Sequence, residues 1–289
     1  MIIVDLNQTM ISNLMVQIGN AKNVEVQEDL LRHMVLNAIR GYRQKFYDEF
    51  GELIIASDDK HYWRRDIFPY YKAHRKAWRD QSGLDWNTIW TSLNKIKEEL
   101  RDIFPYQFIQ VDGAEADDVI GTICHAHGVQ LFYEGCSQIL ILSGDKDYVQ
   151  LQNYVNVKQY DPVRKTWIKN SQPDLFLEEH ILKGDRGDGI PNILSKDDCL
   201  INGRQKPLRK KFMESVLVVN GKTINNLPDE ELKRNYMRNK QLVDLSQTPD
   251  EIKLNILEQF EEPGNSRDKL FNYFIEKRLK NLVEHIGEF

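Results

Sequence analysis

Cysteine is scarce in this 289-residue sequence, and the three cysteines follow no recognisable spacing. Cys124, Cys136 and Cys199 include no Cys-x-x-Cys pair, so no zinc site can be read from them. An odd number without a pattern is typical of reduced thiols in a cytosolic protein. The sequence therefore argues against a disulfide-stapled fold and favours a cytoplasmic location.

Long apolar runs and a surplus of positive charge are also missing. No segment approaches the roughly 20 apolar residues that a membrane-spanning helix needs. The start, MIIVDLNQTMI, lacks a basic leader and contains Asp5, so we expect a buried strand there rather than a signal peptide. The net charge of −5 argues against a protein that coats nucleic acid by bulk charge, although it allows local basic surfaces. We expect no membrane partner.

What is present is the composition of a globular protein with a sizeable core, 41% hydrophobic and 29% charged. Short apolar runs alternate with segments of helical periodicity, which is typical of βαβ units and a parallel sheet. The expected strands lie at 2–4, 53–56, 107–111, 139–142 and near 154–160, and the expected helices at 27–50, 86–102 and 114–127. From about residue 174 the pattern becomes helical. We expect an α/β domain over residues 1–182 and a smaller helical region over residues 183–289.

Each of the four clearest strands runs into an aspartate. The segments IIVD, LIIASD, FIQVD and ILILSGD end at Asp5, Asp58, Asp112 and Asp145. Because the carboxyl ends of parallel strands line one crevice, we expect these side chains to converge. Further acids follow in the next turns: Glu115, Asp117, Asp118 and Asp147. The sequence thus predicts an unusually acidic edge of the sheet.

A purely structural interpretation of these acids stays open. Asp112 and Glu115 could form a capping box at a helix N-terminus, and single aspartates could be turn residues. Capping leaves Asp117, Asp118 and Asp147 unexplained. So many carboxylates in one crevice need a counter-charge, and oxygen ligands favour Mg²⁺ or Mn²⁺ over zinc. Two such ions about 3.5–4 Å apart can stabilise the attacking and leaving oxygens of a phosphoryl displacement, which predicts a hydrolase.

A basic and aromatic segment lies between the second and third expected strands. Residues 61–80, HYWRRDIFPYYKAHRKAWRD, contain six cations and two acids, a local net charge of +4. The cations are Arg64, Arg65, Lys72, Arg75, Lys76 and Arg79, and six aromatic rings are interleaved with them. Cations hold phosphates and flat rings accept stacked bases, so the segment favours nucleic-acid binding over a solvated helix with core rings.

A second basic run, GRQKPLRKK, follows the glycine-rich stretch KGDRGDGIPNI. It contains Arg204, Lys206, Arg209, Lys210 and Lys211. Backbone amides and flanking cations of this kind could hold duplex phosphates. A plain solvated loop explains the run equally well at this stage.

The motifs AEADDVIGTI, ILSGDKDYVQL and LKGDRGDGIPNI, in this order, resemble the 5′-nuclease family of flap endonucleases and 5′–3′ exonucleases. The leading IIVDLN and the basic segment fit the resemblance, which extends over nearly the whole chain and is nearest to the phage ribonuclease H branch. It implies a PIN-like α/β fold, a parallel sheet flanked by helices. A helical arch at about 60–100 would span the active site, and the helical C-terminal region would bind duplex.

The resemblance also implies site residues. The metal-site acids would be Asp5, Asp58, Glu115, Asp117, Asp118, Asp145 and Asp147, with Asp185 and Asp188 from GDRGD. Asp58 is preferred to Asp59 because it comes first after the strand. Lys72 and Arg75 match the arch cations that polarise the scissile phosphate, and Tyr71 an aromatic that stacks on the terminal base. Gly189 stands where the family usually has Asn, and the expected Gly-x-Gly hairpin is missing, so we do not extend the resemblance to a bound monovalent ion.

Together these features predict a nuclease that uses two Mg²⁺ ions, with Mn²⁺ as a substitute. It would remove RNA primers and DNA from 5′ ends, nicks or flaps during lagging-strand replication. The expected partners are DNA, RNA–DNA hybrids and branched duplex, with a single-strand binding protein as a candidate by analogy, and we expect a monomer. The alternatives are a two-metal phosphatase of small phosphoesters, a non-catalytic nucleic-acid-binding protein and a PIN-type toxin ribonuclease.

Overall fold

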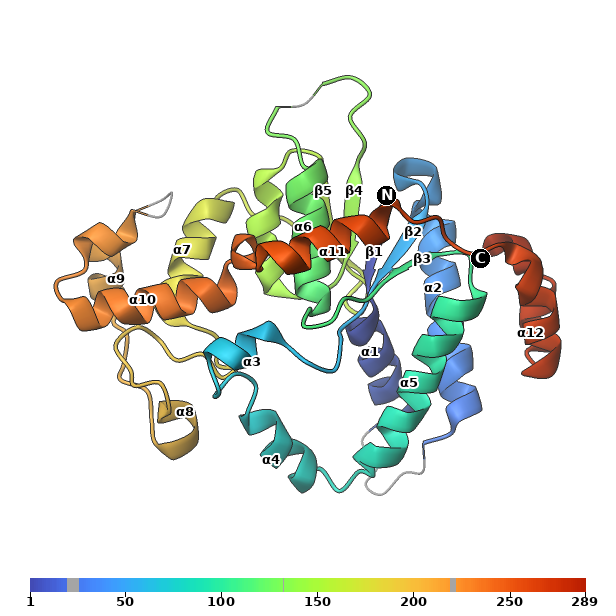
Figure 1. Ribbon diagram of the computed structural model, residues 1–289, viewed down its shortest axis with the longest axis horizontal. Coiled ribbons are helices and arrows are strands. Elements are labelled where there is room, and N and C mark those ends of the chain that lie inside the picture. Colours follow the sequence, from blue (N-terminus) through green and yellow to red (C-terminus); the bar gives the residue numbers. More distant parts are fainter. Residues whose placement is uncertain (20–25, 132, 219–221) are drawn as a thin grey trace.

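A six-stranded, mostly parallel sheet forms the centre of the molecule (Figure 1). The computed structural model describes residues 1–19, 26–131, 133–218 and 222–289. The strand order is β3-β2-β1-β4-β5-β6, in which only β6 runs antiparallel to its neighbour. The strands are β1 (Ile2–Asp5), β2 (Leu53–Ala56), β3 (Gln107–Ile109), β4 (Ile139–Leu142), β5 (Val157–Asp161) and β6 (Thr166–Ile168). In the central register Val4 pairs with both Ile55 and Leu142, so these strands end side by side.

Helices cover both faces of the sheet, because successive strand residues point to opposite sides. On one face Ile2 and Val4 join a buried cluster with α1 (Leu6–Ile18), α2 (Glu28–Phe50) and α5 (Trp86–Ile103). On the other face Ile3 packs against α6 (Ala116–His127) and the 3₁₀ helix η1 (Lys146–Asn153). The central strands β1, β2 and β4 are therefore apolar up to their carboxyl ends, where polar residues begin. None of the described helices is long and apolar enough to cross a membrane.

The segment between β2 and β3, here called the arch segment (residues 60–103), leaves the sheet and returns to it. It contains α3 (Trp63–Ile67), α4 (His74–Gln81) and α5. Figure 1 shows α3 and α4 running out from the sheet edge and α5 leading back to β3. The basic and aromatic residues of the sequence are thus carried over the carboxyl edge of the sheet.

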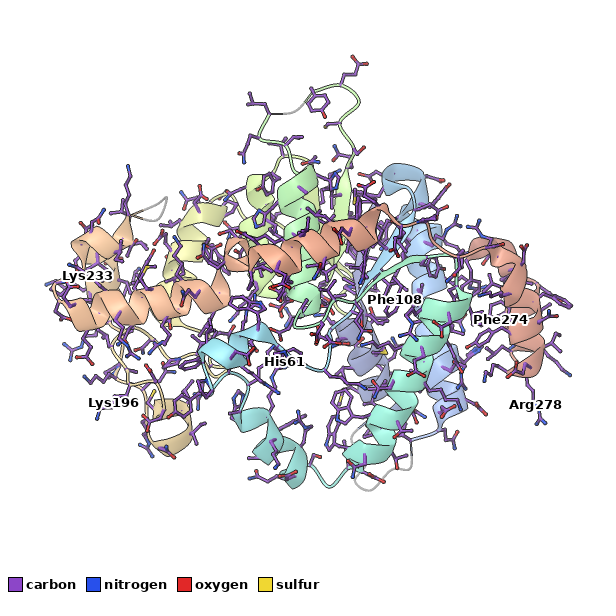
Figure 2. All side chains as sticks on the ribbon, in the orientation of Figure 1. His61, Phe108, Lys196, Lys233, Phe274 and Arg278 are labelled. Carbon is purple, nitrogen blue, oxygen red and sulfur yellow. The ribbon has the colours of Figure 1, made fainter. Side chains whose placement is uncertain are left out.

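The C-terminal part is helical, as expected, and returns to the sheet domain. Its helices are α7 (Pro173–Lys183), α8 (Cys199–Asn202), α9 (Lys210–Val216), α10 (Glu230–Val243), α11 (Asp250–Glu261), α12 (Leu270–Glu276) and α13 (Lys280–Val283). Short 3₁₀ helices are η2 (Thr223–Asn226), η3 (Leu245–Gln247), η4 (Arg267–Lys269) and η5 (Ile286–Glu288). Ile256 of α11 is buried against α6, and Phe274 and Phe289 join the core on the α2 and α5 face. Figure 2 shows Phe274 on α12 and Phe108 of β3, which both belong to that side of the molecule.

Some elements of the sheet domain were not predicted from the sequence, among them η1, α1 and β6. Helix α1 starts directly after β1, because Asp5 ends the strand and also caps the helix by accepting a hydrogen bond from the Gln8 amide at 3.0 Å. Strand β6 is three residues long, lies at the sheet edge and leaves Trp167 exposed, so its apolar pattern is too short to detect. The predicted helix at 27–50 and the four predicted main strands are present.

Candidate active site

Six aspartates line one pocket at the carboxyl edge of the sheet: Asp59, Asp188 and the four described next. Asp5 ends β1, Asp58 follows β2, Asp145 follows β4, and Asp117 lies in the first turn of α6. All four belong to the lining of a cavity of about 600 Å³. The arch segment supplies the opposite wall, with Tyr62, Arg65, Arg75, Arg79, Trp90 and Lys97. The arrangement follows from parallel strands, whose carboxyl ends share one edge.

Polar neighbours fix these carboxylates in place. Asp5 accepts hydrogen bonds from the Ser143 hydroxyl at 3.1 Å, and Asp117 accepts one from the Tyr148 hydroxyl at 2.5 Å. Asp58 accepts from the Ala116 backbone amide at 2.7 Å and from the Asn7 side-chain amide. Sequence reasoning did not single out Asn7, Ser143 or Tyr148, although each lies within or beside a quoted motif. They orient acids that would otherwise be free to rotate.

The electrostatics of the pocket leave negative charge uncompensated. Burial raises the pKa of Asp58 to about 6, aided by the nearby charge of Glu115. Burial and the charge of Asp147 raise the pKa of Asp145 to about 7. Burial and the charge of Asp145 raise the pKa of Asp117 as well. Carboxylates that are costly to ionise together are the donor set that a hard divalent cation would stabilise, so the residues fit Mg²⁺ or Mn²⁺.

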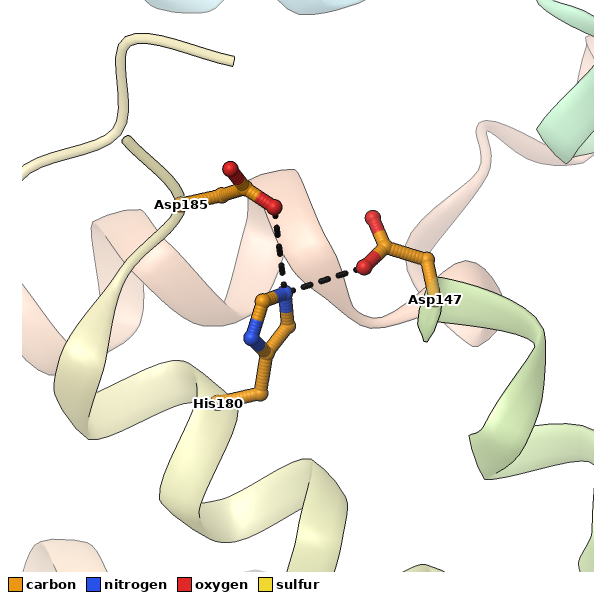
Figure 3. A group of neighbouring side chains, drawn as sticks. All are labelled: Asp147, His180 and Asp185. Atoms are coloured by element: carbon orange, nitrogen blue, oxygen red, sulfur yellow. Dashed lines mark ion pairs between the residues drawn. The ribbon is translucent and has the colours of Figure 1, made fainter. Parts of the chain in front are cut away.

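A second group of ligand atoms lies beside this pocket (Figure 3). It consists of Asp147, Asp185 and His180, whose ligand atoms all lie within 4.8 Å of one another. Lys146 pairs with the Asp185 carboxylate at 2.8 Å. The sequence predicted the two aspartates but not His180, which occupies the last turn of α7 and shows no signal in the sequence. Among the described residues this is the one cluster in which three such atoms come so close.

Glu115 and Asp188 are bonded to cations of the arch segment, and Asp188 also lines the pocket. Lys72 donates to Glu115 at 2.5 Å, and Arg75 donates to Asp188 at 2.6 Å. The Tyr71 hydroxyl lies 2.8 Å from Glu115 and 3.1 Å from Asp188. The two cations predicted to act on phosphate are therefore neutralised by two acids predicted to hold metal.

Asp118, which the sequence predicts at the metal site, does not line the pocket. It is fully buried and accepts hydrogen bonds from the Trp63 indole, the Thr248 hydroxyl and the Glu115 backbone amide. Burial alone would raise the pKa of Asp118, but the guanidinium of Arg64, 2.8 Å away, holds that pKa below its ordinary value. The reciprocal cap of α6 thus pairs Glu115 with Asp118, and Asp112 is an exposed loop residue. Asp118 has a structural role that the spacing of the acids did not indicate.

Two arch residues that the sequence predicts to contact nucleic acid are likewise buried in this structure. Arg64, predicted to bind nucleic acid, is 1% exposed and bridges Asp118 and Glu115. Tyr71, predicted to stack on a base, is 2% exposed and packs with Phe68 and Ile190. The aromatic rings that do line the pocket are those of Tyr62 and Trp90. Arg64 and Tyr71 are buried by contacts with residues far along the chain, and no local sequence pattern encodes such contacts.

The remaining predicted cations are accessible. Arg65, Arg75 and Arg79 line the pocket, and Lys76 is exposed on α4. The second basic run is also exposed, between α8 and the start of α9: Arg204, Lys206, Arg209, Lys210 and Lys211. Figure 1 places α8 and α9 at the same end of the molecule as α10, away from α5. The structure thus separates the predicted cations into a pocket group and a distal group.

Comparison with known proteins gives two family matches that together cover most of the chain. The family described as "5'-3' exonuclease, N-terminal resolvase-like domain" matches residues 13–180, and the one described as "T4 RNase H, C terminal" matches residues 171–289. Ribonuclease H of Enterobacteria phage T4 is 29% identical, over 99% of this chain and 95% of that protein. A 5'-3' exonuclease of Buchnera aphidicola is 28% identical, over 55% of this chain and 53% of that protein.

Solved structures share the fold. The bacteriophage T5 D15 protein crystallised with metal ions superposes with a TM-score of 0.60 at 18% identity, over 90% of this chain and 99% of that one. The same D15 protein, named a flap endonuclease and solved in a pseudo-enzyme-product complex with DNA and metal ions, superposes with a TM-score of 0.61 at 17% identity and the same coverage. The chain therefore has the PIN-like fold that the strand pattern and motifs predict.

Proposed function

The chain belongs to the 5′–3′ exonuclease family, and from that premise we propose that it is a divalent-metal-dependent 5′ nuclease of primers, nicks and flaps. The observation that carries the proposal is the convergence of Asp5, Asp58, Asp117 and Asp145 in one pocket beneath a basic arch segment. A small-molecule phosphatase needs the acids but not an arch with Arg65, Arg75, Arg79 and two aromatic rings. The wall opposite the acids thus favours a polynucleotide substrate.

In the proposed mechanism the chain's own residues position the charges around a phosphodiester. Asp5, Asp58, Asp117 and Asp145 would hold the catalytic cation, and Asp147, Asp185 and Asp188 a second one. Bound Mg²⁺ or Mn²⁺ would supply positive charge for the attacking and leaving oxygens of hydrolysis. Asn7, Ser143 and Tyr148 keep three of the carboxylates oriented.

The arch cations would act on the substrate itself. Arg75 is 45% exposed while it pairs with Asp188, so an incoming phosphate can reach its guanidinium. Lys72 is buried, and its role requires that its contact with Glu115 loosens when substrate and cations bind. Both would then stabilise negative charge that develops on the scissile phosphate. Tyr62 and Trp90 would stack on exposed bases.

The duplex part of the substrate is assigned to the distal group of cations. Arg204, Lys206, Arg209, Lys210 and Lys211 are exposed and lie at the end of the molecule that α8 and α9 occupy. Contacts of this kind position a duplex without reading its sequence. We propose DNA, RNA–DNA hybrids and branched duplex as substrates, and a monomer as the working unit.

A cleavage assay on three substrates tests the proposal. A 5′-labelled flap, a nicked duplex and an RNA–DNA hybrid are incubated with Mg²⁺ or with chelator, and product lengths are read. The proposal expects Mg²⁺-dependent products cut from the 5′ end or near the branch, and competition by unlabelled flap but not by a small phosphoester. Hydrolysis of the small phosphoester with all three nucleic acids intact would contradict it.

A further inference from the structure

His180 adds a nitrogen atom to a part of the site that is otherwise all oxygen. Its Nε2 atom lies 3.0 Å from Asp147 Oδ1 and 3.6 Å from Asp185 Oδ2. Figure 3 shows the imidazole ring of α7 pointing between the two carboxylates, one from η1 and one from the loop after α7. Two separate chain segments, η1 and the end of α7 with the loop after it, therefore bring three ligand atoms to one point.

Two of these ligand atoms are buried without a hydrogen-bond partner. His180 is 6% exposed and Asp147 is 9% exposed. Within the described part of the chain, His180 Nε2 and Asp147 Oδ1 make no hydrogen bond of acceptable geometry, although they lie close together. Burying a polar atom without a partner is unfavourable, so a bound ligand at these atoms would stabilise the fold.

The spacing of the atoms is that of ligands around a single ion. First-row divalent ions hold nitrogen and oxygen donors at about 2.0–2.2 Å, which places neighbouring donors roughly 3–3.6 Å from each other. The two measured separations from Nε2 fall at the ends of this interval. One ion could therefore contact all three side chains with small rotamer adjustments.

The surrounding residues hold the three side chains in this arrangement. The other oxygen of Asp185 accepts from the Gly187 amide at 2.7 Å, which fixes the carboxylate. The His180 ring stacks on Phe176 with centroids 5.8 Å apart and planes tilted by 16°. Lys146 shares Asp185 Oδ2 at 2.8 Å, but its side chain is 51% exposed and can swing into solvent. The site is built from fixed ligands and one displaceable cation.

We propose that Asp147, His180 and Asp185 form a one-imidazole, two-carboxylate site that selects a first-row transition ion, such as Mn²⁺ or Co²⁺, over Mg²⁺. Imidazole suits transition ions, whereas Mg²⁺ prefers oxygen ligands alone. The all-oxygen pocket of Asp5, Asp58, Asp117 and Asp145 lacks this selectivity. The role of the site in cleavage rests on the proposed function, but its metal preference can be measured without substrate.

The test measures ligation directly on the full-length protein, with Mn²⁺ and Co²⁺ as probes. Chelator-treated protein is titrated with Co²⁺, followed by visible absorption, and with Mn²⁺, followed by pulsed electron paramagnetic resonance for coupling to an imidazole nitrogen. The proposal expects nitrogen coupling in the wild type. It expects this coupling to be lost, and Mn²⁺ affinity to fall about tenfold or more, in His180→Gln. The control His127→Gln, an exposed histidine on α6, keeps both signals.

Wild-type protein without nitrogen coupling overturns the proposal, because the His180 nitrogen then does not bind the ion. Unchanged coupling and affinity in His180→Gln overturn it too. The wild-type spectrum decides even if the variant fails to fold, which thermal unfolding in chelator reveals. Mg²⁺-dependent flap cleavage by a wild type without nitrogen coupling rejects this inference alone, whereas nitrogen coupling without any cleavage rejects the nuclease proposal alone.

Discussion

Lys72 and Glu115 join the arch segment to the sheet through a buried ion pair, with Nζ 2.5 Å from Oε1. Glu115 precedes the first turn of α6, and Lys72 lies before α4 with a φ of 54°, a left-handed conformation that is unusual for a lysine. The strained backbone aims the ammonium group at the acid. In the described conformation the arch is therefore docked on the carboxyl edge by the same charges that a substrate and cations would use.

Replacing Lys72 by an uncharged residue tests this relationship. Lys72→Met should slow single-turnover flap cleavage by roughly 10²–10³-fold, because a charge aimed at the scissile phosphate is lost. The free energy of unfolding should fall by about 2 kcal/mol, less than for a fully broken buried pair, since Glu115 keeps Arg64 and Tyr71 as partners. Lys169→Met, an exposed lysine just after β6, is the matched control. A cleavage rate within threefold of wild type would contradict the assigned role.

Arg64 and Arg65 are adjacent in sequence but face different surroundings. Arg64→Gln should lower the free energy of unfolding by about 3–5 kcal/mol, because the buried Asp118 carboxylate loses its positively charged partner. Arg65→Gln should leave stability within about 0.5 kcal/mol, since this side chain is exposed at the pocket. It should weaken DNA binding and reduce the salt dependence of affinity by about one phosphate contact. Denaturant unfolding measures the stability of each variant, and fluorescence anisotropy measures its DNA binding. A stable Arg64→Gln together with a destabilised Arg65→Gln would contradict these roles.

The raised pKa values predict how stability depends on pH without metal. A carboxyl whose folded-state pKa is above its ordinary value stabilises the fold below that ordinary value, and this stability is lost as pH rises through the folded-state pKa. For Asp58, near 6, and Asp145, near 7, the loss falls between about pH 4 and pH 7. We therefore expect chelated protein to unfold more easily at pH 8 than at pH 5.5.

Removing one of these charges should reverse that loss. Asp145→Asn should raise the free energy of unfolding of chelated protein at pH 8 by about 1–2 kcal/mol, a value discounted from the pKa shift because the side chain is partly exposed. Added Mg²⁺ should stabilise the wild type but have less effect on the variant. Thermal melts at both pH values measure this. Equal melting of variant and wild type at pH 8 in chelator would show that the carboxylates do not repel one another.

The C-terminal residue closes the core instead of extending into solvent. Phe289 is fully buried and packs on Phe104 and Phe274, with centroids 5.5 and 5.2 Å apart. Phe289→Ala should therefore cost about 3–5 kcal/mol of stability. Ile275→Ala, on the exposed side of α12, should change it by less than about 0.5 kcal/mol. Denaturant midpoints that move equally for the two variants would contradict this packing.

The parallel sheet and the four pocket aspartates could be predicted because their signals are local. An apolar run identifies each strand, and the acid that follows marks its carboxyl end, so the topology of parallel strands brings Asp5, Asp58 and Asp145 together. Asp117 follows because it lies in the first turn of the next helix. Local patterns of this kind depend on short spans of chain and on general rules of strand packing.

The partners of Arg64 and Tyr71 could not be predicted, because they come from distant segments. Arg64 donates a hydrogen bond to the Leu242 carbonyl at 3.0 Å, across 178 residues of sequence, and the Thr248 hydroxyl donates one to the Asp118 carboxylate. The sequence of a basic segment does not show whether one of its cations faces a phosphate or a buried acid. His180 escaped notice for the same reason, since only the fold brings it to Asp147 and Asp185.

The most direct test of the central claim is single-turnover cleavage of a 5′-labelled flap by Asp145→Asn, with Asp112→Asn as the matched control from the exposed loop before α6. If the pocket aspartates hold the catalytic cation, Asp145→Asn binds the flap with near wild-type affinity in Ca²⁺ yet cleaves at least about 10³-fold more slowly in Mg²⁺, while Asp112→Asn cleaves normally. Cleavage by Asp145→Asn at a near wild-type rate would contradict the assignment of this pocket as the active site.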